Sequence, residues 1–233
     1  MHVRNDRQRR FDLLVLDLDG TLVDSRDILV GLVNEVIKGA GYEPADADAV
    51  AVLIGLPLDE VFRRALPSVA RDAIQALCAT YRRRADAAEF VAKFCLYPDV
   101  ASTLTTLQRS GMRLVIATSK GRATTTDILR HCRVHDLFDH VIGGDCVTRG
   151  KPHPEMVHQA LALQGTPPER ALVVGDTSFD IEMGQAAGAA TCAVTYGMHP
   201  ATQLHQLRPD FMIDGFAALL RLASVGENTP RFA

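Results

Sequence analysis

The sequence predicts an α/β protein, a doubly wound parallel sheet with an inserted all-helical domain. Short apolar runs without polar alternation recur along the chain, which is typical of strands buried on both faces of a parallel sheet. Segments with helical spacing separate these runs. Residues 24–92 contain no convincing strand, and about seventy residues is far longer than an ordinary connection. We therefore assign 1–22 and 93–233 to a core that holds the sheet, and 23–92 to a helical insertion.

The first predicted strand covers 11–16 and leads directly into a pair of acidic residues, Asp17 and Asp19. Two positions apart in an extended chain, their side chains point to the same side. They follow the carboxyl end of the strand, where open α/β sheets bind ligands. Carboxylates this close repel each other, so the pair predicts a bound cation or a shared proton. Gly20 permits a sharp turn here. An acidic turn that caps a helix is the alternative interpretation.

Three helices are predicted in the insertion. Apolar residues three and four positions apart predict a helix over 28–37, and further helices are expected at 58–66 and 69–91. Arg63, on the second of them, is a candidate for a bidentate contact with a substrate carboxylate. A solvent-exposed helix face is the alternative interpretation of Arg63.

Strands and helices alternate in the second half of the chain, which predicts a parallel sheet. Helices are expected at 100–109, 123–132 and 155–163, and strands at 113–117, 140–143, 171–174, 191–195 and 211–213, with 216–222 closing the core.

Polar side chains follow several of these strands. Thr118 directly follows one strand, Lys151 lies in the loop after the next, and Asp176 and Asp180 follow a third. Right-handed crossovers bring the carboxyl ends of parallel strands to one edge of the sheet, so we expect these side chains to meet Asp17. Carboxylate and carbonyl oxygens suit Mg²⁺, whereas a hydroxyl, a lysine and free backbone amides suit a phosphate.

Four motifs carry a family resemblance. DLDGTLVDS at 17–25, TSK at 118–120, GKPHPE at 150–155 and GDTSFDIEMGQAAG at 175–188 resemble those of the haloacid dehalogenase superfamily, specifically its phosphoglycolate phosphatase-like branch. The resemblance covers nearly the whole chain and implies that the helical insertion is a mobile cap over the active site. One departure is Ser119, where asparagine is frequent in the family.

The resemblance also implies a role for each motif residue. Asp17 is implied to be a nucleophile that becomes phosphorylated, and Asp19 an acid and base. Mg²⁺ is the implied cofactor. The remaining assignments are Thr118 and Lys151 as catalytic residues that contact the phosphoryl group, Gly20, Thr21 and Ser119 as further phosphate-binding residues, Asp176 as a metal ligand with Asp17 and Asp19, and Asp180 as support for Lys151 or the metal-bound waters.

The implied function is that of a Mg²⁺-dependent phosphatase acting on a small phosphorylated metabolite, such as a phosphoglycolate-like phosphomonoester. A sugar-phosphate mutase and a pyrophosphatase are alternatives on the same scaffold. Thr21 favours hydrolysis, because such mutases often carry an apolar residue there, and Asp19 argues against a dehalogenase. A phosphoaccepting receiver module is the non-enzyme alternative, but its acidic pair precedes the acceptor and it lacks a helical insertion.

The composition is that of an ordinary globular protein. The 233 residues are 47% hydrophobic and 23% charged, and the net charge of −3 gives no support for a nucleic-acid surface. We expect no signal peptide and no segment that spans a bilayer. The five scattered cysteines lack metal-type spacing and are typical of reduced thiols. We therefore expect a cytoplasmic monomer or homodimer without nucleic-acid or membrane partners.

Overall fold

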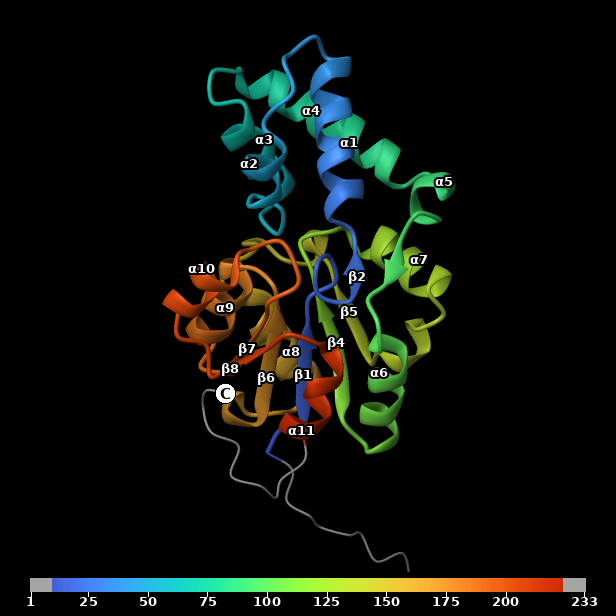
Figure 1. Cartoon of the computed structure of the whole chain (residues 1–233), viewed down its shortest axis with the longest axis vertical. Helices are drawn as coiled ribbons and strands as arrows, with labels where there is room; N and C mark the ends of the chain where they lie inside the picture. Colours follow the sequence, from blue (N-terminus) through green and yellow to red (C-terminus); the bar gives the residue numbers. More distant parts are fainter. Residues whose placement is uncertain (1–9, 224–233) are drawn as a thin grey trace, which may run out of the picture.

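The computed structural model describes residues 10–223 and confirms a six-stranded parallel sheet with helices on both faces (Figure 1). The strand order is β5-β4-β1-β6-β7-β8, so β1 lies where the order of the strands reverses. The strands are β1 (Leu13–Leu16), β4 (Arg113–Ala117), β5 (His140–Ile142), β6 (Ala171–Gly175), β7 (Ala190–Val194) and β8 (Phe211–Ile213).

Side chains of β1 alternate between two layers of helices. Leu13 and Val15 pack with residues of α8 and α9, whereas Leu14 and Leu16 pack with residues of α6, α7 and α11. All four side chains are fully buried, which explains why this strand is continuously apolar. The core helices are α6 (Val100–Arg109), α7 (Arg122–His131), α8 (Glu155–Gln164), α9 (Ser178–Ala186), α10 (Ala201–Gln206) and α11 (Leu219–Ala223), with 3₁₀ segments at His135–Leu137, Gly144–Cys146, Pro168–Arg170 and Phe216–Ala218.

The helices of the insertion pack together at the end of the sheet where the parallel strands finish (Figure 1). A short antiparallel ribbon, β2 (Val23–Asp24) paired with β3 (Cys95–Leu96), joins them to the core. The helices are α1 (Arg26–Gly39), α2 (Ala47–Ala51), α3 (Leu58–Ala65), α4 (Arg71–Ala85) and α5 (Ala88–Val91).

The long helix predicted at 69–91 is wrong, because the chain forms α4 and α5 with a break between them. Asp86 follows α4 and accepts a hydrogen bond from Thr124 of α7, a tertiary contact that local periodicity does not reveal. We also missed α2, α10 and both strands of the ribbon, all too short for a periodic signal. The division of the chain into two domains stays a prediction.

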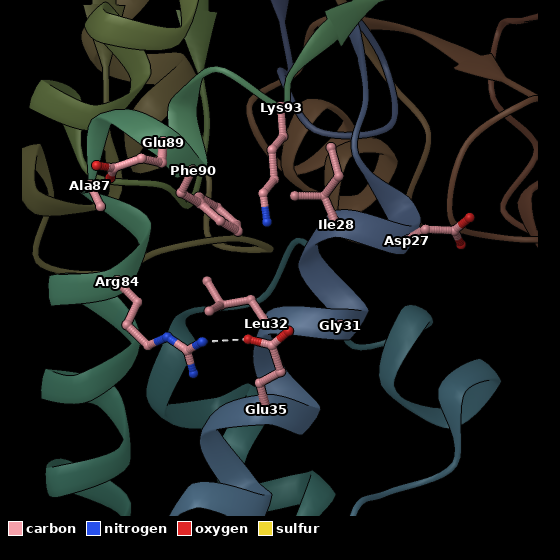
Figure 2. Close-up of a pocket in the computed structure, with 10 residues that line it drawn as sticks. All are labelled: Asp27, Ile28, Gly31, Leu32, Glu35, Arg84, Ala87, Glu89, Phe90 and Lys93. Atoms are coloured by element: carbon pink, nitrogen blue, oxygen red, sulfur yellow. Dashed lines mark hydrogen bonds and ion pairs between the residues drawn. The ribbon is translucent and has the colours of Figure 1, made fainter.

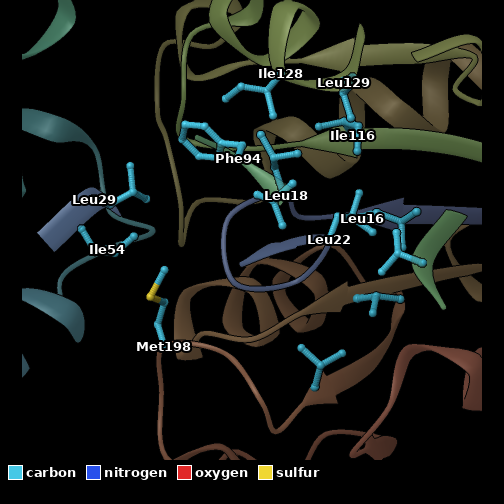
Figure 3. Close-up of a cluster of buried hydrophobic side chains, with 14 of the residues drawn as sticks. Leu16, Leu18, Leu22, Leu29, Ile54, Phe94, Ile116, Ile128, Leu129 and Met198 are labelled. Carbon is cyan, nitrogen blue, oxygen red and sulfur yellow. The ribbon is translucent and has the colours of Figure 1, made fainter. Parts of the chain in front are cut away.

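A buried apolar cluster holds the insertion against the core (Figure 3). Leu29 of α1 and Ile54 of the α2–α3 connection lie in one cluster with Leu18, Phe94 and Met198. Each of these side chains is at most 8% exposed. The helical insertion therefore covers the edge of the sheet where the acidic side chains lie.

Within residues 10–223, no helix combines the length and the apolar character needed to cross a bilayer. The five cysteines, which all lie in this range, are free thiols.

Candidate active site

The Lys151 ammonium lies at the centre of a buried polar cluster. Its Nζ donates hydrogen bonds to Asp17 Oδ1 and to Asp180 Oδ1, both at 2.6 Å. The three side chains are at most 4% exposed. Burial by itself would lower the pKa of the Lys151 amine, but the two carboxylates raise this pKa above its usual value. Lys151 is therefore a fixed positive charge that joins the end of β1 to the first turn of α9.

The first turn of α9 orients Asp180. Thr177, the N-cap residue, donates to Asp180 Oδ2 from its backbone nitrogen at 3.1 Å and from its hydroxyl at 2.6 Å. The Asp180 backbone nitrogen donates back to the Thr177 hydroxyl, which completes a capping box. A Cβ at Gly175 would lie 2.3 Å from the Asp180 side chain, so the strand end must be glycine. Thr177 therefore fixes Asp180 Oδ2, which leaves Asp180 Oδ1 directed at Lys151. This arrangement supports the prediction that Asp180 positions Lys151.

Asp176 is held by groups from two other loops. Its Oδ1 accepts from the Thr21 hydroxyl at 2.7 Å, and its Oδ2 accepts from the Met198 backbone nitrogen at 2.8 Å. A Cβ at Gly20 or Gly197 would lie 2.1 or 2.3 Å from Asp176 Oδ2, and Gly20 has a φ of +82°. We predicted that Thr21 binds phosphate. Its hydroxyl donates to Asp176, because the turn after β1 packs against the end of β6, and phosphate binding by Thr21 stays a prediction.

Three carboxylates form a site with the donor chemistry for a divalent cation. Asp17, Asp176 and Asp180 each offer an oxygen within 4.8 Å of the others. When all three carboxylates are ionised, they and the Lys151 ammonium carry a net charge of −2. Burial raises the pKa of Asp17 to about 7, and burial with the neighbouring carboxylates raises the pKa of Asp176 well above its usual range. A divalent cation relieves this repulsion, and oxygen ligands suit Mg²⁺.

The predicted ligand set is Asp17, Asp176 and the backbone carbonyl of Asp19, and the structure adds the Asp180 carboxylate to the two carboxylates of that set. The role of the Asp19 carbonyl stays a prediction. The carboxylate of Asp19 points elsewhere, with Oδ2 lying 3.2 Å from Lys120 Nζ. Asp19 Oδ1 is buried and, among the described residues, has no hydrogen-bond partner. An unsatisfied buried oxygen in such a site is placed to accept a hydrogen bond from a bound ligand.

Lys120 is a residue that the sequence analysis missed as a site residue. Its side chain is 9% exposed, and its Nζ lies 5.3 Å from the centroid of the Phe94 ring. Burial by itself would lower the pKa of the Lys120 amine, but Asp19, and then Tyr81 of α4, raise this pKa above its usual value. The position of Lys120, two residues after Thr118 at a strand end, was the signal that could have identified it.

Thr118 and Ser119 have different surroundings although they are adjacent. Thr118 is buried, and its hydroxyl oxygen accepts from the Lys120 backbone nitrogen at 3.3 Å, which leaves the hydroxyl proton available for a ligand. The Ser119 hydroxyl donates to the Gly55 carbonyl of the insertion at 2.6 Å. This hydroxyl holds the insertion against the core, and phosphate binding by Ser119 stays a prediction.

His199 provides a further hydrogen bond between the core and the insertion. Its Nδ1 accepts from the Ser178 backbone nitrogen at 3.1 Å, so Nε2 carries the proton and donates to the Val52 carbonyl at 2.9 Å. The residue is 2% exposed, and burial lowers the pKa of its imidazole. The sequence analysis missed this role, because only the tertiary fold brings Val52 and His199 together.

Arg63 lies apart from this cluster. Its side chain is 64% exposed, and its guanidinium forms an ion pair with Glu60 of the same helix. Its contact with a substrate therefore stays a prediction.

A separate open pocket of about 490 Å³ lies between α1 and the α4–α5 region (Figure 2). Ile28, Leu32 and Phe90 line it, and the Lys93 ammonium points into it. It contains none of the predicted site residues.

The buried cluster has the groups that phosphoryl transfer requires. Asp17 provides a carboxylate, one oxygen of which accepts a hydrogen bond from Lys151. Asp19 is a second carboxylate, positioned for proton transfer, and Thr118 offers a hydroxyl. Fixed ammonium groups stabilise negative charge that develops on transferring oxygens.

The chain is similar to known proteins over most of its length. The family model described as haloacid dehalogenase-like hydrolase matches residues 14–194. A phosphoglycolate phosphatase of Aliivibrio fischeri is 32% identical over 219 residues, covering 91% of this chain and 96% of the relative. The pyrophosphatase PpaX of Bacillus cereus is 30% identical over 217 residues, covering 92% and 97%. The solved structure of a haloacid dehalogenase-like family hydrolase from Streptococcus pneumoniae superposes with a TM-score of 0.81 at 28% identity, covering 91% of this chain and 98% of that chain.

Proposed function

This chain belongs to the haloacid dehalogenase-like hydrolase family, and we propose that it is a Mg²⁺-dependent phosphatase that hydrolyses a small phosphorylated metabolite through an aspartyl-phosphate. The observation that carries the proposal is the buried Lys151 ammonium, held between Asp17 and Asp180 beside Asp176. This geometry provides one nucleophilic carboxylate, a fixed positive charge and a set of oxygen ligands in one place.

In the first step, a carboxylate oxygen of Asp17 forms a bond to phosphorus while the bond to the leaving-group oxygen breaks. Asp19 gives its proton to that oxygen. In the second step, water attacks the phosphorus of the aspartyl-phosphate, its proton passes to Asp19, and Asp17 is released with phosphate. Lys151 and the Thr118 hydroxyl stabilise the charge on the transferring oxygens in both steps.

Asp17, Asp176 and the backbone carbonyl of Asp19 would hold the metal, with Asp180 supporting it through Lys151 or bound waters. When bound, Mg²⁺ supplies positive charge that lets an anionic nucleophile approach an anionic phosphoryl group. The charge of −2 on the buried cluster supports this assignment.

The relatives supply two substrate candidates. One is named a phosphoglycolate phosphatase and another a pyrophosphatase, so we propose a compact substrate of this kind. The helical insertion packs closely over the site, which supports a small substrate. Ser119 and His199 donate hydrogen bonds to backbone carbonyls of the insertion. A Cβ added at Gly55 of the insertion would lie only 3.2 Å from the Thr177 side chain of the core.

The test is phosphate release from a panel of phosphorylated metabolites, pyrophosphate included, with and without Mg²⁺. Wild-type protein is expected to release phosphate only with Mg²⁺, and Asp17→Asn is expected to abolish release while preserving the circular dichroism spectrum. Activity retained by Asp17→Asn would refute the proposal. Conversion of a hexose 1-phosphate to the 6-phosphate would identify a mutase instead, and a long-lived acid-stable phosphoprotein would identify a receiver.

A further inference from the structure

Lys120 places a second buried ammonium where the core meets the helical insertion. It follows Thr118 and Ser119 in the loop after β4, and its Nζ lies 3.2 Å from Asp19 Oδ2. The Phe94 ring lies 5.3 Å from the same nitrogen, and Tyr81 of α4 interacts with it electrostatically from the insertion. Phe94 itself packs beside Leu18, at the turn that carries Asp19 (Figure 3).

The two buried lysines differ in how many carboxylates they contact. Lys151 contacts two, Asp17 and Asp180, each at 2.6 Å. Across residues 10–223, Lys120 has Asp19 as its single ion-pair partner, at the longer distance of 3.2 Å. An ammonium has three donor hydrogens, so Lys120 keeps donors for a further anion. A buried charge with few partners is costly, which a bound anion would offset.

The partner of each lysine indicates which part of a substrate it faces. Lys151 contacts the nucleophile Asp17, so it faces the transferred phosphoryl group. Lys120 contacts Asp19, the residue that protonates the leaving-group oxygen in the proposed mechanism. Because this oxygen is part of the leaving group, Lys120 lies on the leaving-group side of the site.

We propose that Lys120 binds an anionic group on the leaving-group part of the substrate. The inference rests on the proposed phosphatase activity and assigns to it a specificity-determining residue, which would select phosphorylated metabolites with a second negative charge a few bonds from the transferred phosphoryl group. Lys120 is a second candidate for the carboxylate-binding role that we predicted for Arg63, which is exposed and paired with Glu60.

A matched pair of substrates isolates this contact. 2-Phosphoglycolate and 2-hydroxyethyl phosphate have the same two-carbon skeleton, but only the first carries a carboxylate. Wild-type enzyme is expected to have a kcat/KM at least about 30-fold higher for 2-phosphoglycolate, the size of effect typical of a buried charge pair. Lys120→Met is expected to lower this value about 100-fold for 2-phosphoglycolate and less than tenfold for 2-hydroxyethyl phosphate.

Two further variants complete the experiment. Lys120→Arg keeps the charge and is expected to retain most of the preference for the carboxylate. Lys93→Met removes an exposed ammonium outside the cluster, which points into the separate pocket, and is expected to leave the ratio of the two kcat/KM values unchanged (Figure 2).

The outcomes separate this inference from the proposed function. A wild-type ratio near one, or equal losses on both substrates in Lys120→Met, would overturn the inference while the phosphatase activity stands. The wild-type ratio needs no variant, so the test survives if Lys120→Met fails to fold. Wild-type protein that releases no phosphate from any compound of the metabolite panel would overturn the proposed function and this inference with it.

Discussion

Replacing Lys151 with methionine tests the electrostatic centre of the site. The substitution keeps an unbranched apolar side chain one atom shorter, but it removes an ammonium that makes two hydrogen bonds of 2.6 Å to side chains at most 4% exposed. Asp17 and Asp180 would then remain buried beside Asp176 without a positive charge between them. Removing one partner of a buried ion pair costs about 3–5 kcal/mol, so we expect a loss of that size in the free energy of unfolding.

The assay is urea unfolding followed by circular dichroism without divalent cations, beside the phosphatase assay with Mg²⁺. Lys93→Met is the control, because it removes an exposed ammonium and is expected to change stability by less than about 0.5 kcal/mol. We also expect Lys151→Met to lose phosphatase activity, since the transferring oxygens lose their fixed positive charge.

A double-mutant cycle makes the reasoning refutable. Lys151→Met and Asp180→Asn are combined, and the coupling free energy is taken from the two single variants and the double variant. Residues that share a buried hydrogen bond are expected to couple by about 1–3 kcal/mol. Additive losses, or a Lys151→Met loss near that of Lys93→Met, would show that this ammonium does not balance the buried carboxylates.

Three further predictions concern the groups around this centre. Gly20→Ala is expected to destabilise the protein more than Gly165→Ala, because both glycines have positive φ but only a Cβ at Gly20 meets Asp176; equal urea midpoints would contradict this. Burial lowers the pKa of His199, so the unfolded chain binds a proton more readily and stability is lost as the pH falls below about 6.5. His199→Phe is expected to show a smaller loss between pH 7.5 and 5.5, and an unchanged loss would assign the pH dependence elsewhere. Mg²⁺ at 100 times its Kd is expected to stabilise the folded protein by about 2.7 kcal/mol and so to raise the Tm, and EDTA is expected to reverse this rise. If the Tm of Asp176→Asn rises with Mg²⁺ as much as that of the wild type, the metal binds elsewhere.

The strand ends show how far local pattern can reach. The run from Phe11 to Leu16 predicted a buried strand, and the acidic pair after it predicted a cation or a shared proton. Both predictions rest on properties of a few neighbouring residues: side-chain alternation, burial and charge repulsion. The right-handed crossover rule then brought Lys151, Asp176 and Asp180 to the same edge without any knowledge of distances.

The partners of individual hydroxyl groups were beyond such reasoning. Thr21 and Ser119 follow strand ends, as phosphate-binding residues do, yet their hydroxyls donate to Asp176 and to the Gly55 carbonyl. A hydroxyl has the same chemistry whichever acceptor it meets. The choice depends on which loop the fold places against it, here from 155 and 64 residues away in the chain.

The sequence by itself determined the class of fold, the edge of the sheet that holds the site and the carboxylates and lysine that gather there, because these follow from periodicity, charge and the handedness of the connections. Only the tertiary structure decided that Lys120 pairs with Asp19, and that Ser119 and His199 hold the insertion over the site. Each of these depends on distances between segments far apart in the chain, and packing rather than local pattern sets those distances.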